Sequence, residues 1–274
     1  MAKQKQKIEE KEAAFLYDLV LVQQWRERFD ELLDASIKLP EKGTFLEIGS
    51  GTGAYAIDLV VRGGNDVKVI GLENNEAMRV IAQGKAEMQK VSRVEFRAGS
   101  VADNDLPEAR FALVVADASL LPTEAQAALW LEAARLADKG ATVAVKLATR
   151  GSFDEFFSIY WEALYELDWL DATAALESLI TSRVTASEAE AMAQAAKLKQ
   201  ISSETHRLSF SFADGKTFLN DPLMRNWFLD EWLALRPATD RQQLEDKLAE
   251  VIDRAREELD FELSIKATIV MARK

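Results

Sequence analysis

Apolar and polar positions between residues 41 and 150 follow two alternating patterns. Strands are predicted at residues 44–48, 67–72, 94–97, 111–116 and 141–148, and the run 111–116 is apolar throughout, which is typical of a strand buried on both faces of a parallel sheet. The stretches between several of them have the spacing of helices, namely 54–61, 75–90 and 123–137. This alternation predicts an α/β fold with a doubly wound, mostly parallel sheet.

The pattern changes on both sides of this core. Before it, residues 12–33 have apolar positions at helical spacing. After it, helical stretches are predicted at about 152–169, 172–181, 187–200, 219–235 and 240–259, with strands at 205–212 and 261–271. We therefore expect four regions, which are an N-terminal helical segment (1–40), a core (41–150), a helical insertion (151–203) and a part that completes the core (204–274).

Local signals predict some of the boundaries. Thr123 with Gln126, and Ser152 with Glu155, match the capping-box pattern at the start of a helix. Gly140 is predicted to stop the helix that begins at Thr123, because glycine commonly follows the last helical residue.

Composition narrows the class of protein. No apolar run is long enough to cross a membrane, and charged residues 1–12 lack the apolar core of a signal peptide, so a cytoplasmic location is expected. Without cysteine and with one histidine, thiolate and histidine-rich metal sites are excluded, and no metal is expected. The net charge of −12 disfavours a nucleic-acid partner, although a local basic patch is compatible with it.

A glycine-rich turn follows the first predicted strand. Gly49, Gly51 and Gly53 alternate just before the helix that begins at Ala54. Glycine adopts positive φ and lets the backbone approach a ligand, and a strand that leads through such a turn into a helix is typical of nucleotide-binding folds. Glu47 precedes the turn, and a carboxylate there suits a cationic ligand better than a pyrophosphate.

The spacing of Glu47, Gly49, Gly51 and Gly53 resembles motif I of class I S-adenosylmethionine (SAM) methyltransferases, E/D-x-G-x-G-x-G. SAM carries a sulfonium and an ammonium group and has no phosphate, which agrees with the charge argument. The resemblance implies a Rossmann-like, seven-stranded sheet with an antiparallel final strand and a helical insertion after strand five. It also implies that these four residues bind SAM, with S-adenosyl-L-homocysteine as the product.

Glu73 ends the second predicted strand, about twenty residues past the glycines, where a carboxylate can accept two hydrogen bonds from a ribose diol. The position matches the family's second motif, so the resemblance implies Glu73 as the ribose ligand. Asn74 would lie beside it, and Met78 would pack on the adenine. The alternative for Glu73 is a favourable charge at a helix N-terminus.

Ser100 and Val101 match the position of the family's third motif, after the third strand. The family often has an aspartate where Ser100 stands, bonded to the adenine amino group. The resemblance implies that Ser100 makes this contact or, if the loop bends back, that Asp103 does. Val101 would offer a backbone N–H and an apolar face.

Three residues are catalytic candidates. Asp117 ends the fourth strand, and the carboxyl ends of such strands line the ligand crevice. His206 is the only side chain with an ordinary pKa near neutrality, although a lone histidine at the start of a strand is more often structural. In many class I methyltransferases an N-terminal helix closes over the cofactor, which implies that Tyr17 reaches it; packing on an amphipathic helix is the alternative.

The resemblance implies an enzyme that transfers a methyl group from SAM to a small-molecule, partly apolar acceptor, similar to methyltransferases of quinone biosynthesis. No Asn-Pro-Pro-Tyr-type motif follows the fourth strand, which argues against methylation of adenine or glutamine. A non-catalytic SAM-binding regulator or scaffold and an NAD-type oxidoreductase are alternatives, and Glu47 argues against the second. A titration with SAM and NADH, followed by a turnover assay, would separate the three.

The insertion begins with a helix rich in aromatic residues, among them Phe153, Phe156, Phe157, Tyr160 and Trp161. We expect residues 151–200 to form a lid over the methyl-transfer pocket, with some of these rings facing the acceptor. The alternative is that the rings form the core of the insertion itself.

Overall fold

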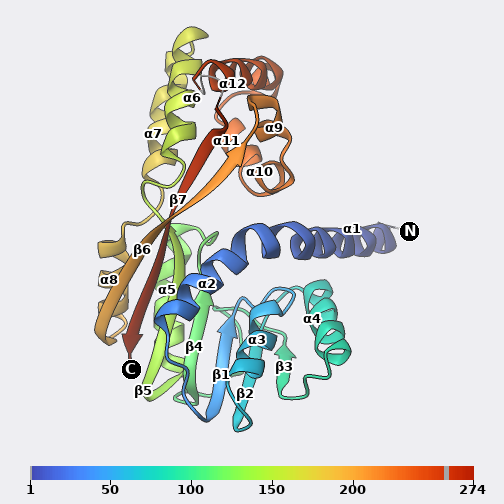
Figure 1. Ribbon diagram of the computed structural model, residues 1–274, viewed down its shortest axis with the longest axis vertical. Coiled ribbons are helices and arrows are strands. Elements are labelled where there is room, and N and C mark those ends of the chain that lie inside the picture. The colour runs from blue at the N-terminus through green and yellow to red at the C-terminus, as the bar shows by residue number, and fades with distance from the viewer. Residues whose placement is uncertain (1, 256–258) are drawn as a thin grey trace. The chain divides into compact units, whose positions relative to one another are not determined.

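The computed structural model describes residues 2–255 and 259–274 of the chain (Figure 1). The chain divides into two compact units. The first comprises Met1–Leu147, Ala186–Thr205 and Thr268–Lys274, and the second comprises Ala148–Thr185 and His206–Ala267. Within the described ranges, no helix has both the length and the apolar character needed to cross a membrane.

The described strands form a seven-stranded sheet in the order β3-β2-β1-β4-β5-β7-β6. Their bounds are β1 Gly43–Ile48, β2 Val67–Leu72, β3 Val94–Arg97, β4 Phe111–Asp117, β5 Ala137–Thr149, β6 Lys199–Phe212 and β7 Phe261–Arg273. β1 pairs in parallel with β2 and β4, β2 with β3, and β4 with β5. The final strand, β7, runs antiparallel (Figure 1). The predicted doubly wound, mostly parallel sheet with an antiparallel final strand is confirmed.

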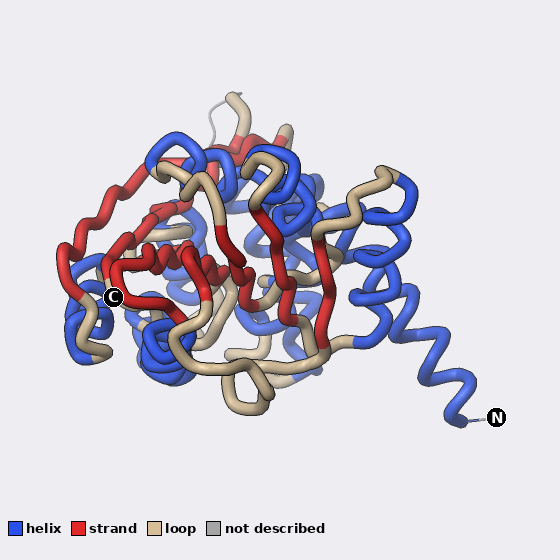
Figure 2. The backbone as a smooth tube through the Cα atoms, turned by 90° about the horizontal axis from the view of Figure 1, so that it is seen from below, coloured by secondary structure: helices blue, strands red, loops and turns tan. Residues whose placement is uncertain are grey.

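The N-terminal segment is helical from residue 2 to residue 36, as α1 Ala2–Leu16, the π-helix η1 Tyr17–Arg26 and α2 Glu27–Ser36. Figure 2 shows α1 leading away from the strands toward the N-terminus. In η1 the backbone N–H of Glu27 donates to the carbonyl oxygen of Val22, five residues earlier. Such wide turns often occur at functional sites, and this one carries Tyr17 and Arg26 at its two ends.

The other helices of the first unit are α3 Ala54–Arg62, α4 Glu76–Met88, α5 Thr123–Leu136 and α8 Ala186–Ala195. α3 packs on β1, β2 and β3, and α4 packs on β3. Alternate residues of a strand face the same side of a sheet, so Phe45, Val67 and Val69 share a face and are buried in one core cluster with Leu59 of α3. This packing holds the amino end of α3, and with it the glycine turn, against the sheet.

α5 begins at Thr123 as predicted and ends one residue before the predicted 137, but neither of the two predicted boundary signals acts as expected. Its N-terminal cap has no side-chain hydrogen bond, so Thr123 and Gln126 do not form a capping box, and Gln126 Nε2 instead donates to the carbonyl oxygen of Leu121, 3.1 Å away. The helix ends at Leu136 because the next residue already pairs with β4. Gly140 therefore does not stop the helix and lies inside β5, with a φ of 80°.

The second unit contains a cluster of aromatic rings. Phe153, Phe156 and Tyr160 are fully buried. The ring centroids of Phe153 and Phe156 lie 4.9 Å and 4.8 Å from that of Trp232. The helices of this unit are α6 Asp154–Glu166, η2 Leu170–Ala172, α7 Thr173–Thr181, α9 Gly215–Asn220, α10 Pro222–Trp227, α11 Leu229–Leu233, η3 Ala238–Asp240 and α12 Arg241–Ala255. These buried rings form the core of this unit. This agrees with the alternative interpretation of their pattern, in which they pack in a core and do not face an acceptor.

Other predictions in the insertion and after it need correction. Ser152 does not cap α6: its hydroxyl donates to the carbonyl oxygen of Thr149 at 2.7 Å, and Glu155 accepts from Ser264. The single helix predicted at 219–235 is three short helices, because Asp221 caps a new start at α10. β6 begins at residue 199, before the predicted 205.

Candidate functional site

β1 leads into a turn that requires glycine. Gly49, Gly51 and Gly53 have φ of 72°, 55° and 80°, in the left-handed region that glycine alone adopts readily. Space is also limited, because a Cβ on Gly51 would lie 2.6 Å from Tyr17 Oη and one on Gly53 would lie 2.5 Å from Phe96 Cζ. The turn therefore brings bare backbone against side chains from distant elements.

Glu73 lies beside this turn, at the carboxyl end of β2. The parallel register pairs Ile48 with Leu72, so the residues that follow them meet at the same edge of the sheet. Glu73 Oε2 accepts from the backbone N–H of Gly51 at 3.0 Å, and Oε1 accepts from that of Asn75 at 2.8 Å. A carboxylate has about four lone-pair positions, so Glu73 keeps acceptor capacity for a ligand's hydroxyl groups.

α4 begins next to Glu73. The side chain of Asn75 caps it by accepting from the backbone N–H of Met78 at 3.1 Å, which fixes the half-buried Met78 in the first turn. Asn74 is exposed, and its carbonyl oxygen accepts from Arg79 Nη1 at 2.7 Å. The predicted cofactor residues Glu73, Asn74 and Met78 therefore belong to one strand-to-helix corner.

Ser100 and Val101 lie in the loop after β3. The backbone N–H of Ser100 donates to the carbonyl oxygen of Asp103 at 2.8 Å, and Ser100 Oγ accepts from the N–H of Asp103 at 3.2 Å. The hydroxyl of Ser100 retains its own proton as a donor. Val101 is half-buried.

Glu47 is the most deeply buried acid of the site. Its side chain is fully buried, and Oε1 accepts from Arg26 Nη2 at 3.1 Å. Among the described residues, Oε2 has no hydrogen-bond partner. Burial raises the pKa of Glu47 to about 7, against the opposing effects of the cationic Arg26 and Lys146. An unpartnered, buried carboxylate oxygen marks a place where a donor or cation would be bound.

The guanidinium of Arg26 connects the acceptors around the turn. Nε donates to Asp117 Oδ2 at 3.0 Å, and Nη2 also donates to the carbonyl oxygen of Gly49 at 2.9 Å. Nη1 donates to Tyr17 Oη at 2.5 Å. Burial raises the pKa of Tyr17, although Arg26 opposes this effect. The edge of the sheet thus already accommodates one cation among carboxylate, carbonyl and phenol oxygens.

Asp117 is fixed from several sides. Ser119 donates to its Oδ1 from the backbone N–H at 2.9 Å and from the hydroxyl at 2.6 Å. Lys146, fully buried on β5, lies 3.6 Å from Asp117 Oδ2 and is also paired with Asp30. Burial alone would raise the pKa of Asp117, but Lys146, Arg26 and Ser119 outweigh it and hold this pKa at about 2.

A cavity of about 220 Å³ lies between the turn and the end of β4, and its lining includes Tyr17, Leu21, Arg26, Gly49 and Asp117. Small-molecule sites typically have volumes of about 300–1,000 Å³. The space is small because η1 packs against the turn, with Tyr17 Oη over Gly51. A nucleoside-sized ligand would require η1 to move.

His206 lies on β6 in the second unit, where it is exposed. The other candidate residues all belong to the first unit. Within the described part of the chain, no group of three or more histidine or acidic side chains could hold a metal ion.

Residues 45–140 match the family profile of the methyltransferase domain. This segment is a methyltransferase domain. The match extends from β1 into β5 and includes the glycine turn, Glu73 and Asp117, and it confirms the resemblance seen in the sequence. A search of curated protein sequences gave no match.

Solved structures share the fold of the chain that carries this methyltransferase domain. The YcgJ protein from Bacillus subtilis is 17% identical with a TM-score of 0.60, over 90% of this chain and 98% of that one. A second structure is the phosphoethanolamine N-methyltransferase 2 of Haemonchus contortus in complex with phosphomonomethylethanolamine and S-adenosylhomocysteine. It is 13% identical with a TM-score of 0.56, over 96% of this chain and 58% of that one. The [4+2]-cyclase SpnF is 17% identical with a TM-score of 0.54, over 92% and 82%.

Three residues around the turn of the methyltransferase domain, Arg26, Asp30 and Lys146, were missed from the sequence. A signal was present for each. Arg26 follows Val22 by four residues and Asp30 follows Arg26 by four, so both lie on the apolar stripe of their helix. Lys146 interrupts an apolar strand, and a charge in a strand buried on both faces requires a charged partner.

Proposed function

We propose that this chain is a SAM-dependent methyltransferase that transfers the methyl group to a small-molecule acceptor. The observation that carries the proposal is the buried Glu47, whose Oε2 has no partner among the described residues, at the edge of a methyltransferase domain. Leaving such an oxygen without a partner costs about 1–3 kcal/mol, and a cationic ligand would recover that cost.

The acceptors around the turn suit the charges of SAM. Glu47, the carbonyl oxygen of Gly49 and Asp117 all bind the guanidinium of Arg26. The ammonium group of SAM would use Glu47, Gly49 and Asp117, and its carboxylate would pair with Arg26, the only cation among the described residues that line this cavity. No phosphate has to be held beside Glu47, which would repel it.

The adenosine part would lie along the ends of β2 and β3. Glu73 has free lone pairs for the ribose diol. Met78, in the first turn of α4, offers an apolar surface to the adenine ring, with Asn74 at its rim. Ser100 and Val101 would contact the edge of the base through the Ser100 hydroxyl and the Val101 backbone N–H.

When bound, SAM supplies a methyl carbon on a good leaving group, so the protein must mainly align the acceptor and exclude water. Tyr17 and Leu21 of η1 line the cavity and would keep water out. Asp117, with a pKa of about 2, stays anionic and is a weak base. Tyr17, with its raised pKa, keeps its proton. Both are better suited to binding than to proton transfer.

The small-molecule class of the acceptor is supported by a structural neighbour, the Haemonchus contortus enzyme, whose structure contains phosphomonomethylethanolamine. The second candidate function is a SAM-binding protein that does not transfer the methyl group. It is supported by the [4+2]-cyclase SpnF, a neighbour with the same fold that is named for another reaction. Release of S-adenosylhomocysteine in the presence of acceptors separates the two.

Isothermal titration of SAM, S-adenosylhomocysteine and NADH tests cofactor binding. The wild type should bind the first two and not NADH. Gly51→Val should abolish binding, because its side chain would meet Tyr17 and Arg26 within 2.7 Å. Gly64→Val is the matched control, since Gly64 also has positive φ but no atom within 4 Å of the added Cβ. Unchanged SAM affinity in Gly51→Val would place the cofactor elsewhere.

A further inference from the structure

Near β1, β2 and β3, one face of the sheet lacks a covering helix. α3 and α4 pack on these strands, and α3, α4 and α5 provide the connections after β1, β2 and β4. The connection from β3 to β4, residues 98–110, is described throughout and contains no helix. Parallel strands are normally covered on both faces, so the missing helix leaves part of this sheet open.

The sequence of the strands is adapted to this open face. Val67 and Val69 belong to the core cluster on the helix-covered side, so Lys68 and Ile70 between and after them face the other side. Lys68 is exposed, and so are Glu95 and Arg97 on the neighbouring β3. Because these residues are charged, the uncovered face of the sheet can be exposed to water. Their side chains can also bind a ligand.

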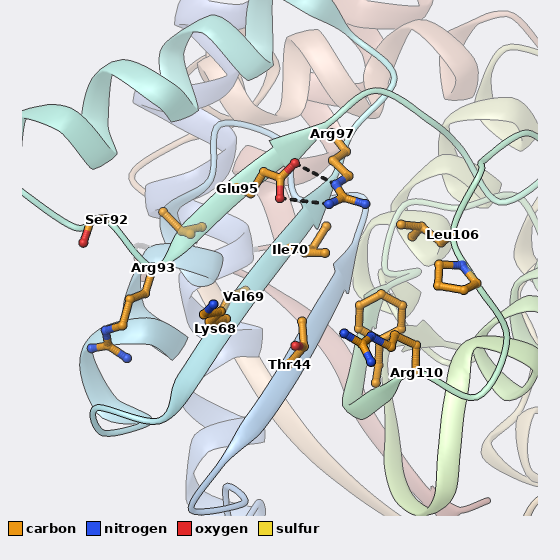
Figure 3. Close-up of a pocket in the computed structure, with 13 residues that line it drawn as sticks. Thr44, Lys68, Val69, Ile70, Ser92, Arg93, Glu95, Arg97, Leu106 and Arg110 are labelled. Carbon is orange, nitrogen blue, oxygen red and sulfur yellow. Dashed lines mark hydrogen bonds and ion pairs between the residues drawn. The ribbon is translucent and has the colours of Figure 1, made fainter.

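A cavity of about 530 Å³ lies on this face, within the range of about 300–1,000 Å³ that is typical of small-molecule sites. Figure 3 shows its lining, in which Thr44, Lys68 and Arg110 lie toward one end and the Glu95–Arg97 pair toward the other. Thr44 is the second residue of β1 and lies five residues before Gly49, about 16 Å along an extended strand. The end of the cavity that holds Thr44, Lys68 and Arg110 is therefore separate from the glycine turn.

The charges of this lining are unbalanced. It carries the cations Lys68, Arg93, Arg97 and Arg110 but a single acid, Glu95. Arg97 pairs with Glu95 through two bonds of 2.8 Å and 2.9 Å, and Arg93 donates to backbone carbonyl oxygens. In the described part of the chain, the side chains of Lys68 and Arg110 have no hydrogen-bond or ion-pair partner.

We propose that this cavity is a second ligand site, for a small molecule that carries a phosphate or carboxylate group next to an apolar part. The anion would be held by Lys68 and Arg110, with the hydroxyl of Thr44 between them as a further donor. The apolar part would contact Ile70 and Leu106. The site does not depend on the proposed methyl transfer.

A small anion fits these observations better than a nucleic acid. A phosphate backbone is typically held by about 6–10 cationic contacts, whereas this cavity offers two unpaired cations. The net charge of −12 also repels a polyanion at long range. A single anionic group close to Lys68 and Arg110 is bound by short-range hydrogen bonds, which survive screening by salt.

NMR titration of the isotope-labelled protein with phenyl phosphate, benzoate and inorganic phosphate tests the proposal. Phenyl phosphate or benzoate should cause saturable shifts at Lys68, Ile70 and the residues around Arg110, and the stronger of the two identifies the anionic group. Lys68→Glu and Arg110→Glu should each weaken this binding about tenfold or more. Lys139→Glu, which changes an exposed lysine outside the cavity, should not.

The same variants keep this test apart from the proposed cofactor site. SAM affinity and thermal stability should be unchanged in Lys68→Glu and Arg110→Glu, because both positions are exposed and lie at the amino ends of their strands. If none of the three probes gives saturable shifts at millimolar concentration, or if Lys139→Glu weakens binding as much as Lys68→Glu does, there is no such site.

Discussion

Replacing Glu47 by glutamine should stabilise the free protein above neutral pH. Burial raises the pKa of Glu47 from its ordinary 4.5 to about 7. The stabilising contribution of such a group is complete below about pH 4.5 and is lost as the pH rises through about 7, because the folded state holds the proton more tightly. The difference corresponds to about 3 kcal/mol, and a neutral glutamine would not lose it.

Urea unfolding of the wild type and Glu47→Gln, near pH 4.5 and well above pH 7, measures this effect. Above pH 7 the variant should be more stable by about 3 kcal/mol, while near pH 4.5 the two should be equal. The glutamine carbonyl can still accept from Arg26, so the ion cluster keeps its geometry. Glu76→Gln, at an exposed position, controls for the loss of one negative charge. A wild type at least as stable as Glu47→Gln above pH 7 would refute the reasoning.

The remaining predictions concern cofactor affinity, the buried charges and the insertion. Wild-type SAM affinity, measured by calorimetry, should fall as the pH falls through about 7, because the Glu47 carboxylate then gains a proton and no longer attracts a cation. An affinity that does not change with pH would contradict this. Glu73→Ala should weaken SAM binding by about 1.5–3 kcal/mol, whereas Glu76→Ala should leave it unchanged, and equal effects would mean that Glu73 does not bind the ribose. Lys146→Met should lower the free energy of unfolding by about 3–5 kcal/mol, because it leaves two buried carboxylates short of a cation; the exposed Lys139→Met should have little effect, and a stable Lys146→Met protein would show that the pairing contributes little. Hydrogen exchange in residues 154–166 should be as slow as in β4 with or without SAM, because the rings of this helix are buried; fast exchange that SAM slows would instead support a lid.

The strands of the methyltransferase domain could be predicted from the sequence because they are buried on both faces. In the run from Phe111 to Ala116, for example, nearly every position is apolar and buried, so the strand is visible without knowledge of its neighbours. The glycine turn was equally visible, because Gly49, Gly51 and Gly53 are required by their own backbone angles. Both features depend on residues that are close together in the sequence, so the sequence alone is enough to predict them.

The features that the sequence did not reveal depend on contacts between distant residues. Arg26 reaches Asp117 across 91 positions, and Lys146 reaches Asp30 across 116, so no window of sequence contains both partners. The aromatic helix of the insertion posed the same difficulty. Its pattern fits a lid or a core, and only the ring contacts with Trp232 identify it as core.

The buried charges around the turn also constrain how this sequence can change over time. Arg26, Asp30, Asp117 and Lys146 form one connected set, so the loss of any one of these charges leaves another without compensation. Substitutions at these four positions should be strongly non-additive, with single changes disfavoured and paired changes tolerated. Among related sequences, the lysine in β5 and the aspartate in α2 should therefore be lost or retained together, even where the rest of both elements has diverged.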